Sequence, residues 1–155
     1  MSSGCDTKET KCCVGEISGQ CYCGDFVFTV AEKVEAVSIC HCNMCRHHSG
    51  ADYTTWVSIQ MEKFHSNRCL KDLKKFAVSE KSEAYFCKHC NTKVLSIDTK
   101  YPSLYGIPRG IFRGGVLVKS ADHFFWDHRA CWFDGSVMGQ KHGGETGFEK
   151  VRELS

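Results

Sequence analysis

The chain has 155 residues, of which 42% are hydrophobic and 25% are charged, and its formal net charge at pH 7 is +2. This size fits one domain with its own core, and the near-neutral charge, which no run of like charges concentrates, argues against nucleic-acid and membrane-surface partners. The first residues contain no apolar stretch typical of a secretory signal, and no later stretch has the length of a membrane span. We therefore expect an intracellular protein in the cytoplasm, with the nucleus as the alternative.

Short apolar segments separated by Gly, Asn, Asp and Cys run through most of the chain, and stretches of helical period are few. We therefore predict a mainly β fold, with clear alternation in Phe26, Phe28 and Val30. Residues 1–16 are interpreted as a mobile leader, residues 17–134 as the folded domain, and residues 135–155, rich in Gly and charge, as a surface extension. The predicted strands are residues 24–30, 34–40, 53–60, 70–76, 82–87, 93–98, 111–118 and 123–126.

Twelve cysteines are a large excess for this length, and they indicate either a disulfide framework in an oxidising compartment or metal ligation in a reducing one. Seven of them fall in three short segments, Cys21-Tyr22-Cys23, Cys40-His41-Cys42-Asn43-Met44-Cys45 and Cys87-Lys88-His89-Cys90. Sulfurs at these spacings can reach one ion but are usually too close for an unstrained disulfide between them. The pattern therefore favours metal.

Structural zinc sites are tetrahedral and commonly take their four ligands as two short-spaced pairs. Cys40, Cys42 and Cys45 form one compact loop that would not easily divide between two ions. The natural partition of the seven cysteines gives four ligands to one ion and three to another, so we predict two Zn²⁺ ions per chain. A site with three protein ligands has room for water or a substrate.

Taken in order, Gly-x-Cys-x-Cys-Gly, Cys-His-Cys-x-x-Cys-Arg and Phe-Cys-x-x-Cys resemble the motifs of the glutathione-dependent formaldehyde-activating enzyme family, which shares its domain with centromere protein V. The resemblance covers about residues 17–133 and includes Ser49-Gly50-Ala51 after the triplet. Its closing segment contains His123, Asp127, Ala130, Trp132 and Phe133.

The resemblance implies the all-β Mss4-like fold with two zinc ions of different roles. By this resemblance, the structural zinc has the ligands Cys21, Cys23, Cys87 and Cys90. The catalytic zinc has the ligands Cys40, Cys42 and Cys45.

Three features depart from the family pattern. Asn91 follows the third segment where the family usually has Gly, and we expect it to adopt the left-handed conformation that such a knuckle requires. Cys131 stands where Pro is frequent, and Phe124-Phe125-Trp126 is bulkier than we would expect. The wall near the catalytic site, and with it the substrate, is therefore where this chain should differ.

A zinc ion held by three thiolates is a soft and weak Lewis acid, which favours sulfur chemistry. The resemblance implies a carbon–sulfur lyase or S-(hydroxymethyl)glutathione synthase-like enzyme, which joins a small thiol such as glutathione to formaldehyde or cleaves the adduct. A carboxylate of glutathione would need a cation, and Arg46, directly after the last ligand, is the predicted substrate-binding residue. Arg109 and Arg113 are further candidates. Arg46 could equally offset the thiolate charge, and the other two could be solvated.

Several histidines have two interpretations. His41, His47 and His48 could supply a fourth ligand or a proton shuttle, or they could be polar surface residues. His89, inside a tight knuckle, is expected to be exposed. The alternative to an enzyme is a non-catalytic zinc module that recruits a protein or chromatin partner.

The remaining cysteines and aromatic residues are interpreted as structural. Cys69 and Cys131 should be small buried hydrophobic residues, and Trp132 and Phe133 should belong to the core. Bystander roles are expected for Cys5, Cys12 and Cys13.

Overall fold

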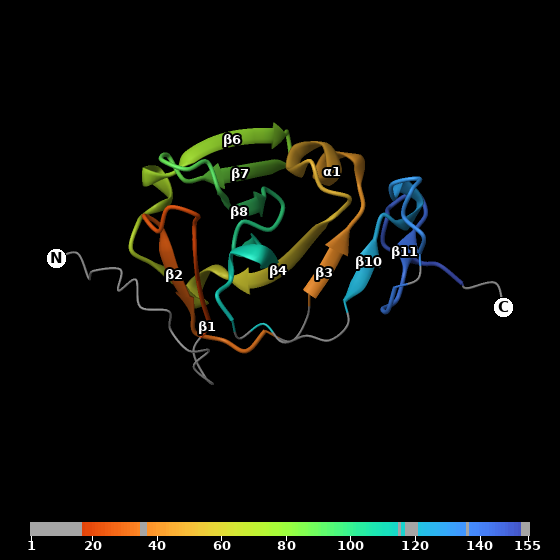
Figure 1. Cartoon of the computed structure of the whole chain (residues 1–155), viewed down its shortest axis with the longest axis horizontal. Helices are drawn as coiled ribbons and strands as arrows, with labels where there is room; N and C mark the ends of the chain where they lie inside the picture. Colours follow the sequence, from red (N-terminus) through yellow and green to blue (C-terminus); the bar gives the residue numbers. More distant parts are fainter. Residues whose placement is uncertain (1–16, 35–36, 115, 117–120, 136, 153–155) are drawn as a thin grey trace. The chain divides into compact units, whose positions relative to one another are not determined.

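The structure is a computed structural model, and it describes residues 17–34, 37–114, 116, 121–135 and 137–152 (Figure 1). By its internal contacts the chain forms two compact units, residues 1–34 with 57–117 and residues 35–56 with 118–155. Strand β4 (Thr54–Gln60) runs through the boundary, so residues 54–56 belong to the second unit and 57–60 to the first. Cys5, Cys12 and Cys13 lie outside the described residues.

The first unit consists of antiparallel strands joined by short turns (Figure 1). One sheet has the order β1 (Ile17–Gln20), β2 (Val27–Val30) and β5 (Phe64–Ser66). Four further neighbouring strands are β9 (Leu104–Pro108), β8 (Lys93–Asp98), β7 (Ser82–Phe86) and β6 (Lys74–Ser79). Short 3₁₀ turns are η1 (Met61–Lys63), η2 (Leu70–Asp72) and η3 (Arg109–Ile111). The β1–β2 and β7–β8 reversals carry the first and third cysteine segments.

The alternation predicted for the first strand is present in the core of this unit. Phe26, Phe28 and Val30 are buried, and the residues between them are half-buried. The Phe28 ring stacks on Phe64 at 5.1 Å and meets the edge of Phe112 at 5.2 Å. Because full burial of a Phe side chain contributes about 1.5–3 kcal/mol, this stack stabilises the hairpin whose turn carries Cys21 and Cys23.

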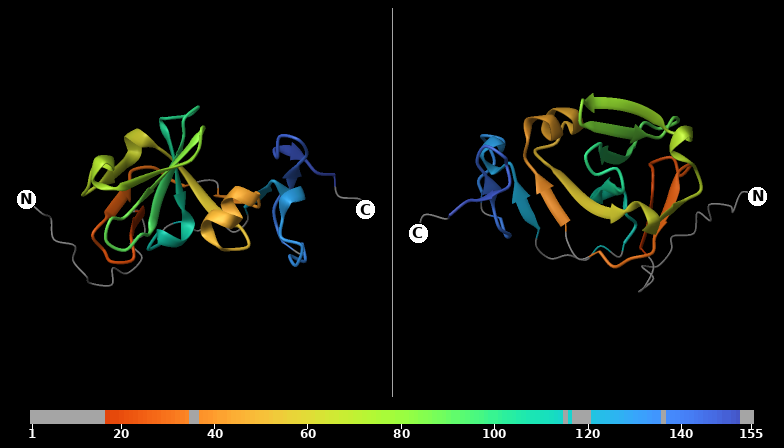
Figure 2. Two further views of the ribbon diagram at one scale, coloured as in Figure 1. Left: turned by 90° about the horizontal axis from the view of Figure 1, so that it is seen from above. Right: turned by 180° about the vertical axis from the view of Figure 1, so that it is seen from behind.

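The second unit contains a parallel strand pair, β3 (Val37–Cys40) with β10 (Asp122–Phe124), in which Phe124 lies opposite Cys40. Helix α1 (Asn43–Ser49) follows β3, and η4 (Trp126–His128) follows β10. Strands β11 (His142–Gly143) and β12 (Glu149–Lys150) form a short antiparallel pair. Figure 2 shows the segment that contains them in blue. This pair lies in the segment predicted to be a surface extension, and His142 within it is buried.

The prediction of a mainly β fold is confirmed, and most predicted strands overlap observed ones. The prediction for residues 70–76 is partly wrong, because residues 70–72 form η2 and the strand β6 runs from 74 to 79. Six further elements were not predicted, namely the strands β1, β5, β9, β11 and β12 and the helix α1. Within the described part of the chain, no helix has both the length and the apolar character that crossing a membrane requires.

The prediction of a strand over residues 111–118 is wrong for residues 111 and 112, which the structure describes. Ile111 ends the 3₁₀ turn η3, and Phe112 makes a single bridge to Gly19. The preceding segment forms strand β9 instead, because Tyr105 and Ile107 alternate on its buried face and Pro108 ends it. Residues 115, 117 and 118 of the predicted strand lie outside the described residues.

Substituting Gly19 should destabilise the first unit. A Cβ at this position would lie 2.5 Å from the Ile111 carbonyl oxygen and would also meet the Phe28 ring. The backbone carbonyl cannot move without disturbing η3, so Gly19→Ala should lower the free energy of unfolding by about 1–3 kcal/mol. Urea unfolding followed by circular dichroism measures this. Gly110→Ala is the matched control, since nothing lies within 4 Å of its Cβ position; equal stabilities of the two variants would contradict the explanation.

Candidate metal centres

The first cysteine cluster lies entirely in the first unit. The sulfurs of Cys21 and Cys23, from the β1–β2 turn, and of Cys87 and Cys90, from the β7–β8 turn, all lie within 4.8 Å of one another. The Cys21–Cys23 and Cys23–Cys87 sulfur distances are 3.6 and 3.8 Å, and none of these cysteines forms a disulfide. The structure thus brings together the four residues that the family resemblance assigns to one ion, and four thiolates match the donor set of a structural zinc site.

Each of the two turns is shaped by a residue in the left-handed region. Gly24 has φ +79° and donates its N–H to the Cys21 carbonyl at 3.1 Å. Asn91 has φ 59° and donates its N–H to the Cys87 carbonyl at 3.0 Å, which confirms the conformation predicted for it. The Tyr22 N–H donates to the Thr92 hydroxyl at 3.0 Å, so the turns are also tied to each other.

Charges next to this cluster hold the turns in place. Arg68 pairs with Asp25 at 2.6 Å, and the Asn67 side chain donates to the Asp25 carbonyl at 2.9 Å. His89 is 67% exposed, as expected, and its Nε2 lies 3.7 Å from the Asp25 carboxylate. Burial opposes ionisation of Cys90, but hydrogen bonds from the Thr92 hydroxyl and from the backbone lower the pKa of this thiol to about 6. These hydrogen bonds thus favour the thiolate form of Cys90, which is the form that binds a metal.

The second cluster lies entirely in the second unit and has one ligand fewer. The sulfurs of Cys40, at the end of β3, Cys42, at the N-cap of α1, and Cys45, inside α1, lie within 4.8 Å of one another. In the described part of the chain, no ligand atom of a fourth His, Cys, Asp or Glu lies that close to all three. His41, His47 and His48 are therefore not brought to the cluster as fourth ligands.

The start of helix α1 explains how the three sulfurs meet. The Cys42 sulfur accepts the N–H of Cys45 at 3.2 Å, which caps the helix. Hydrogen bonds from Cys40 and then from Cys45 lower the pKa of Cys42 strongly, against its burial. The pKa of Cys40 is raised by its side-chain hydrogen bond with Cys42, then by that with Cys45, and then by burial. The three cysteines are thus coupled, with the thiolate form favoured at Cys42 and disfavoured at Cys40, and metal ligation would release protons from the thiols.

Arg46 directly follows the ligand Cys45 and lies on helix α1. Its Nη2 donates to the Asn43 side chain at 2.8 Å, which holds the guanidinium beside the metal loop. Its Nε is buried and has no hydrogen-bond partner among the described residues. One donor of Arg46 is therefore left for another acceptor. Arg109 and Arg113 belong to the first unit, where Arg109 donates to the Val116 carbonyl at 2.9 Å.

A buried histidine pair that was not predicted from the sequence lies beside the second cluster. His41 is fully buried, and its Nε2 lies 2.8 Å from Nδ1 of His123, which is 1% exposed. Burial, followed by the charges of His123, Arg129 and Arg46, lowers the pKa of His41 to about 4, so the ring is neutral at pH 7. The burial of His41 could have been predicted, because in a strand Val37, Ile39 and His41 point to the same face.

Three residues interpreted as buried are exposed instead, and these predictions were wrong. Cys69 and Cys131 are both exposed. Cys69 caps the turn η2, where its N–H donates to the Asp72 carboxylate at 3.0 Å. Trp132 is 67% exposed and donates its indole N–H to Asp52 at 3.0 Å. An indole N–H needs an acceptor, and here the acceptor is a surface carboxylate. Phe133 is half-buried.

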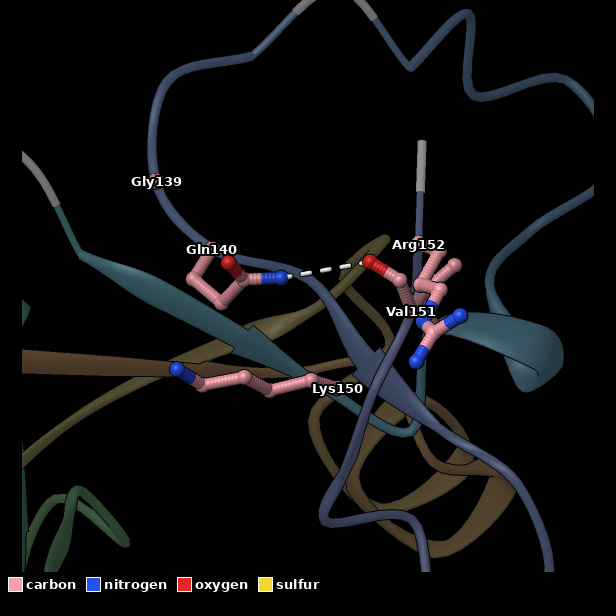
Figure 3. Close-up of a pocket in the computed structure, with 5 residues that line it drawn as sticks. All are labelled: Gly139, Gln140, Lys150, Val151 and Arg152. Carbon is pink, nitrogen blue, oxygen red and sulfur yellow. Dashed lines mark hydrogen bonds between the residues drawn. The ribbon is translucent and has the colours of Figure 1, made fainter. Parts of the chain in front are cut away.

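An open pocket in the second unit is separate from both clusters (Figure 3). The side-chain amide of Gln140 donates to the Val151 carbonyl at 3.3 Å, the dashed line in Figure 3. The pocket is lined by Gly139, Gln140, Lys150, Val151 and Arg152.

Comparison with known proteins gives three findings. A model of the glutathione-dependent formaldehyde-activating enzyme family matches residues 16–128. An uncharacterized lyase of Schizosaccharomyces pombe is 26% identical over 99 residues, which span 64% of this chain and 70% of that protein. A solved structure of a Rhodobacter sphaeroides protein is similar with a TM-score of 0.50 and 18% identity, over 61% of this chain and 85% of its own. The similarity to this solved structure shows the fold of the chain and nothing of its function.

Replacing Cys87 by Ser should unfold much of the first unit, because a structural metal site contributes its binding energy to folding. The expected loss in free energy of unfolding is on the order of 5 kcal/mol, a large part of the stability of a domain. Thermal unfolding of the zinc-loaded protein, followed by circular dichroism, measures it. Cys69→Ser is the control, since Cys69 is exposed and lies outside both clusters. A normal melting temperature for Cys87→Ser would rule out a structural role.

Proposed function

The chain belongs to the glutathione-dependent formaldehyde-activating enzyme family, and from this premise we propose that it is a zinc-dependent carbon–sulfur lyase of this type. Its substrate is the adduct of formaldehyde with a small thiol, glutathione being the candidate. In the synthetic direction a carbon–sulfur bond forms between thiol and formaldehyde, and the thiol proton ends on the new hydroxyl. The reverse direction breaks the same bond and returns the proton to sulfur.

The difference between the two cysteine clusters carries this proposal. Four sulfurs meet in the first cluster, and three meet in the second. We assign a structural zinc to the first cluster, and to Cys40, Cys42 and Cys45 a catalytic zinc, so that the chain holds two ions. A zinc ion bound by three thiolates lowers the pKa of a thiol that takes its open position.

The chain's own residues prepare the second cluster for an anionic sulfur substrate. The Cys42 sulfur is held by the Cys45 N–H, so the ligand loop is fixed by helix α1 before any ligand binds. Arg46 supplies the positive charge. Its Nε–H is buried and has no partner among the described residues, so it can donate to a ligand. A carboxylate of the thiol substrate would satisfy this donor with a charge-assisted hydrogen bond.

Cys42→Ser should weaken metal binding at the second cluster and leave the fold intact. The first cluster and the aromatic core of the first unit do not involve Cys42, so circular dichroism should stay close to that of the unchanged protein. Zinc content should fall from two ions towards one, and lyase activity should be lost. A Cys42→Ser protein that is unfolded and has lost both ions would contradict the assignment of one structural and one catalytic centre.

Arg46 should set a preference for thiols that carry a carboxylate. In Co²⁺-substituted protein, glutathione should change the visible charge-transfer spectrum, and 2-mercaptoethanol, which has no carboxylate, should bind more weakly by about 1–3 kcal/mol. Arg46→Ala should remove this difference, and Arg113→Ala, which changes an exposed Arg of the first unit, should keep it. A spectrum that no thiol alters at millimolar concentration would favour a non-catalytic zinc module over the enzyme.

A further inference from the structure

Two linked hydrogen bonds, one buried and one part-buried, lead from the C-terminal segment to the metal loop of the second unit. His123 Nε2 lies 3.1 Å from the carbonyl oxygen of Met138, and its Nδ1 lies 2.8 Å from Nε2 of His41. Both rings are almost completely buried. We call Met138, His123 and His41 the histidine relay. His41 itself stands between Cys40 and Cys42, two of the three cysteines of the second cluster.

The chemistry of the groups decides which ring atoms carry protons. A carbonyl oxygen can only accept, so the proton of His123 is on Nε2, which donates to Met138. Since a neutral imidazole has one N–H, Nδ1 of His123 is left as an acceptor. His41 must then donate to it from Nε2, and His41 Nδ1 keeps a bare lone pair. This Nδ1 is buried and has no partner among the described residues.

The backbone and the neighbouring rings hold His41 as firmly as the relay does. The His41 N–H donates to the Phe124 carbonyl at 3.0 Å, next to the parallel pairing of β3 with β10. The rings of Tyr53, Trp126 and Phe133 surround the imidazole at centroid distances of 5.2–5.5 Å. Packing thus fixes the plane of the His41 ring, and the hydrogen bond to His123 fixes which edge of the ring faces His123. A rotation of the backbone at His41 would displace the sulfurs on both sides of it.

We propose that His41 is a positioning residue of the second cluster, and that the histidine relay fixes the Cys40–Cys42 turn in the shape that brings both sulfurs to Cys45. The segment that provides Met138 is then part of the metal site. The inference rests on the proposed function only in so far as the second cluster binds a metal. It requires neither glutathione nor turnover, so its failure and that of the lyase proposal can be told apart.

The first test measures the position of the proton. Long-range ¹H–¹⁵N spectra of histidine-labelled protein should show His41 protonated at Nε2 and bare at Nδ1, with and without metal. The measurement uses the unchanged protein, so it does not depend on any variant folding. A proton on Nδ1 of His41 would overturn the relay.

The second test separates positioning from packing. His123→Phe keeps a flat buried ring but removes the acceptor, and His123→Asn keeps an acceptor near the place of Nδ1. Partners of metal ligands typically contribute 10–100-fold to affinity. His123→Phe should therefore weaken Co²⁺ binding at the second cluster by about 10–100-fold and leave the first cluster unchanged, and His123→Asn should restore most of the loss.

The control for this test is His142→Phe. His142 is also a buried histidine of the second unit, stacked on Phe124 at 4.6 Å and hydrogen-bonded to Phe148 and Asp122, and it makes no hydrogen bond to the relay. We expect it to lower the melting temperature without weakening the second metal site. Equal losses of Co²⁺ affinity in His123→Phe and His142→Phe would reduce His123 to a packing residue, and unchanged affinity in His123→Phe would refute the proposal.

Discussion

Convergence of sulfur atoms from turns that are distant in the chain is the constraint on which this structure depends. Cys23 and Cys87 are 64 positions apart, yet their sulfurs lie 3.8 Å from each other. Two β-hairpins can bring their turns together only if the backbone reverses at a defined residue in each hairpin. Gly24 and Asn91 provide these reversals through left-handed backbone conformations, which other residue types adopt at a cost. The aromatic stack around Phe28 then holds the first hairpin in register.

The two clusters use the same sulfur chemistry with different supports. In the first cluster, both ligand pairs lie in hairpin turns, and the donor set is complete with four sulfurs. In the second, a strand end and the first turn of a seven-residue helix supply three sulfurs. Three thiolates around a divalent ion leave one negative charge, and four leave two, so the second centre repels an incoming thiolate less. This difference in charge and in ligand number suits the second centre to an exchangeable ligand.

The cysteine segments could be predicted because metal-ligand spacing is a local property of sequence. The conformation of Asn91 was predicted because the family usually has Gly at this position, and the alternation of Phe26 and Phe28 predicted their burial. Contacts between distant residues could not be predicted. His41 looks like a polar residue in a turn until His123, 82 positions away, is placed against it. The strand predicted for residues 111–118 failed for a similar reason, because Tyr105 and Ile107 of the neighbouring segment fill the core instead.

Unpaired polar atoms give a further reason to treat the second cluster as the functional one. Buried polar atoms of native proteins nearly always have partners, and the exceptions call for a ligand, a water or a catalytic role. In the described part of the chain, His41 Nδ1, an acceptor, and Arg46 Nε, a donor, are such exceptions, and both belong to the loop and helix of the second cluster. No such atom occurs among the described residues around Cys21 or Cys87. The buried polar side chains near the first cluster thus have partners within the protein, whereas His41 Nδ1 and Arg46 Nε have none among the described residues, as the proposed role of the second cluster requires.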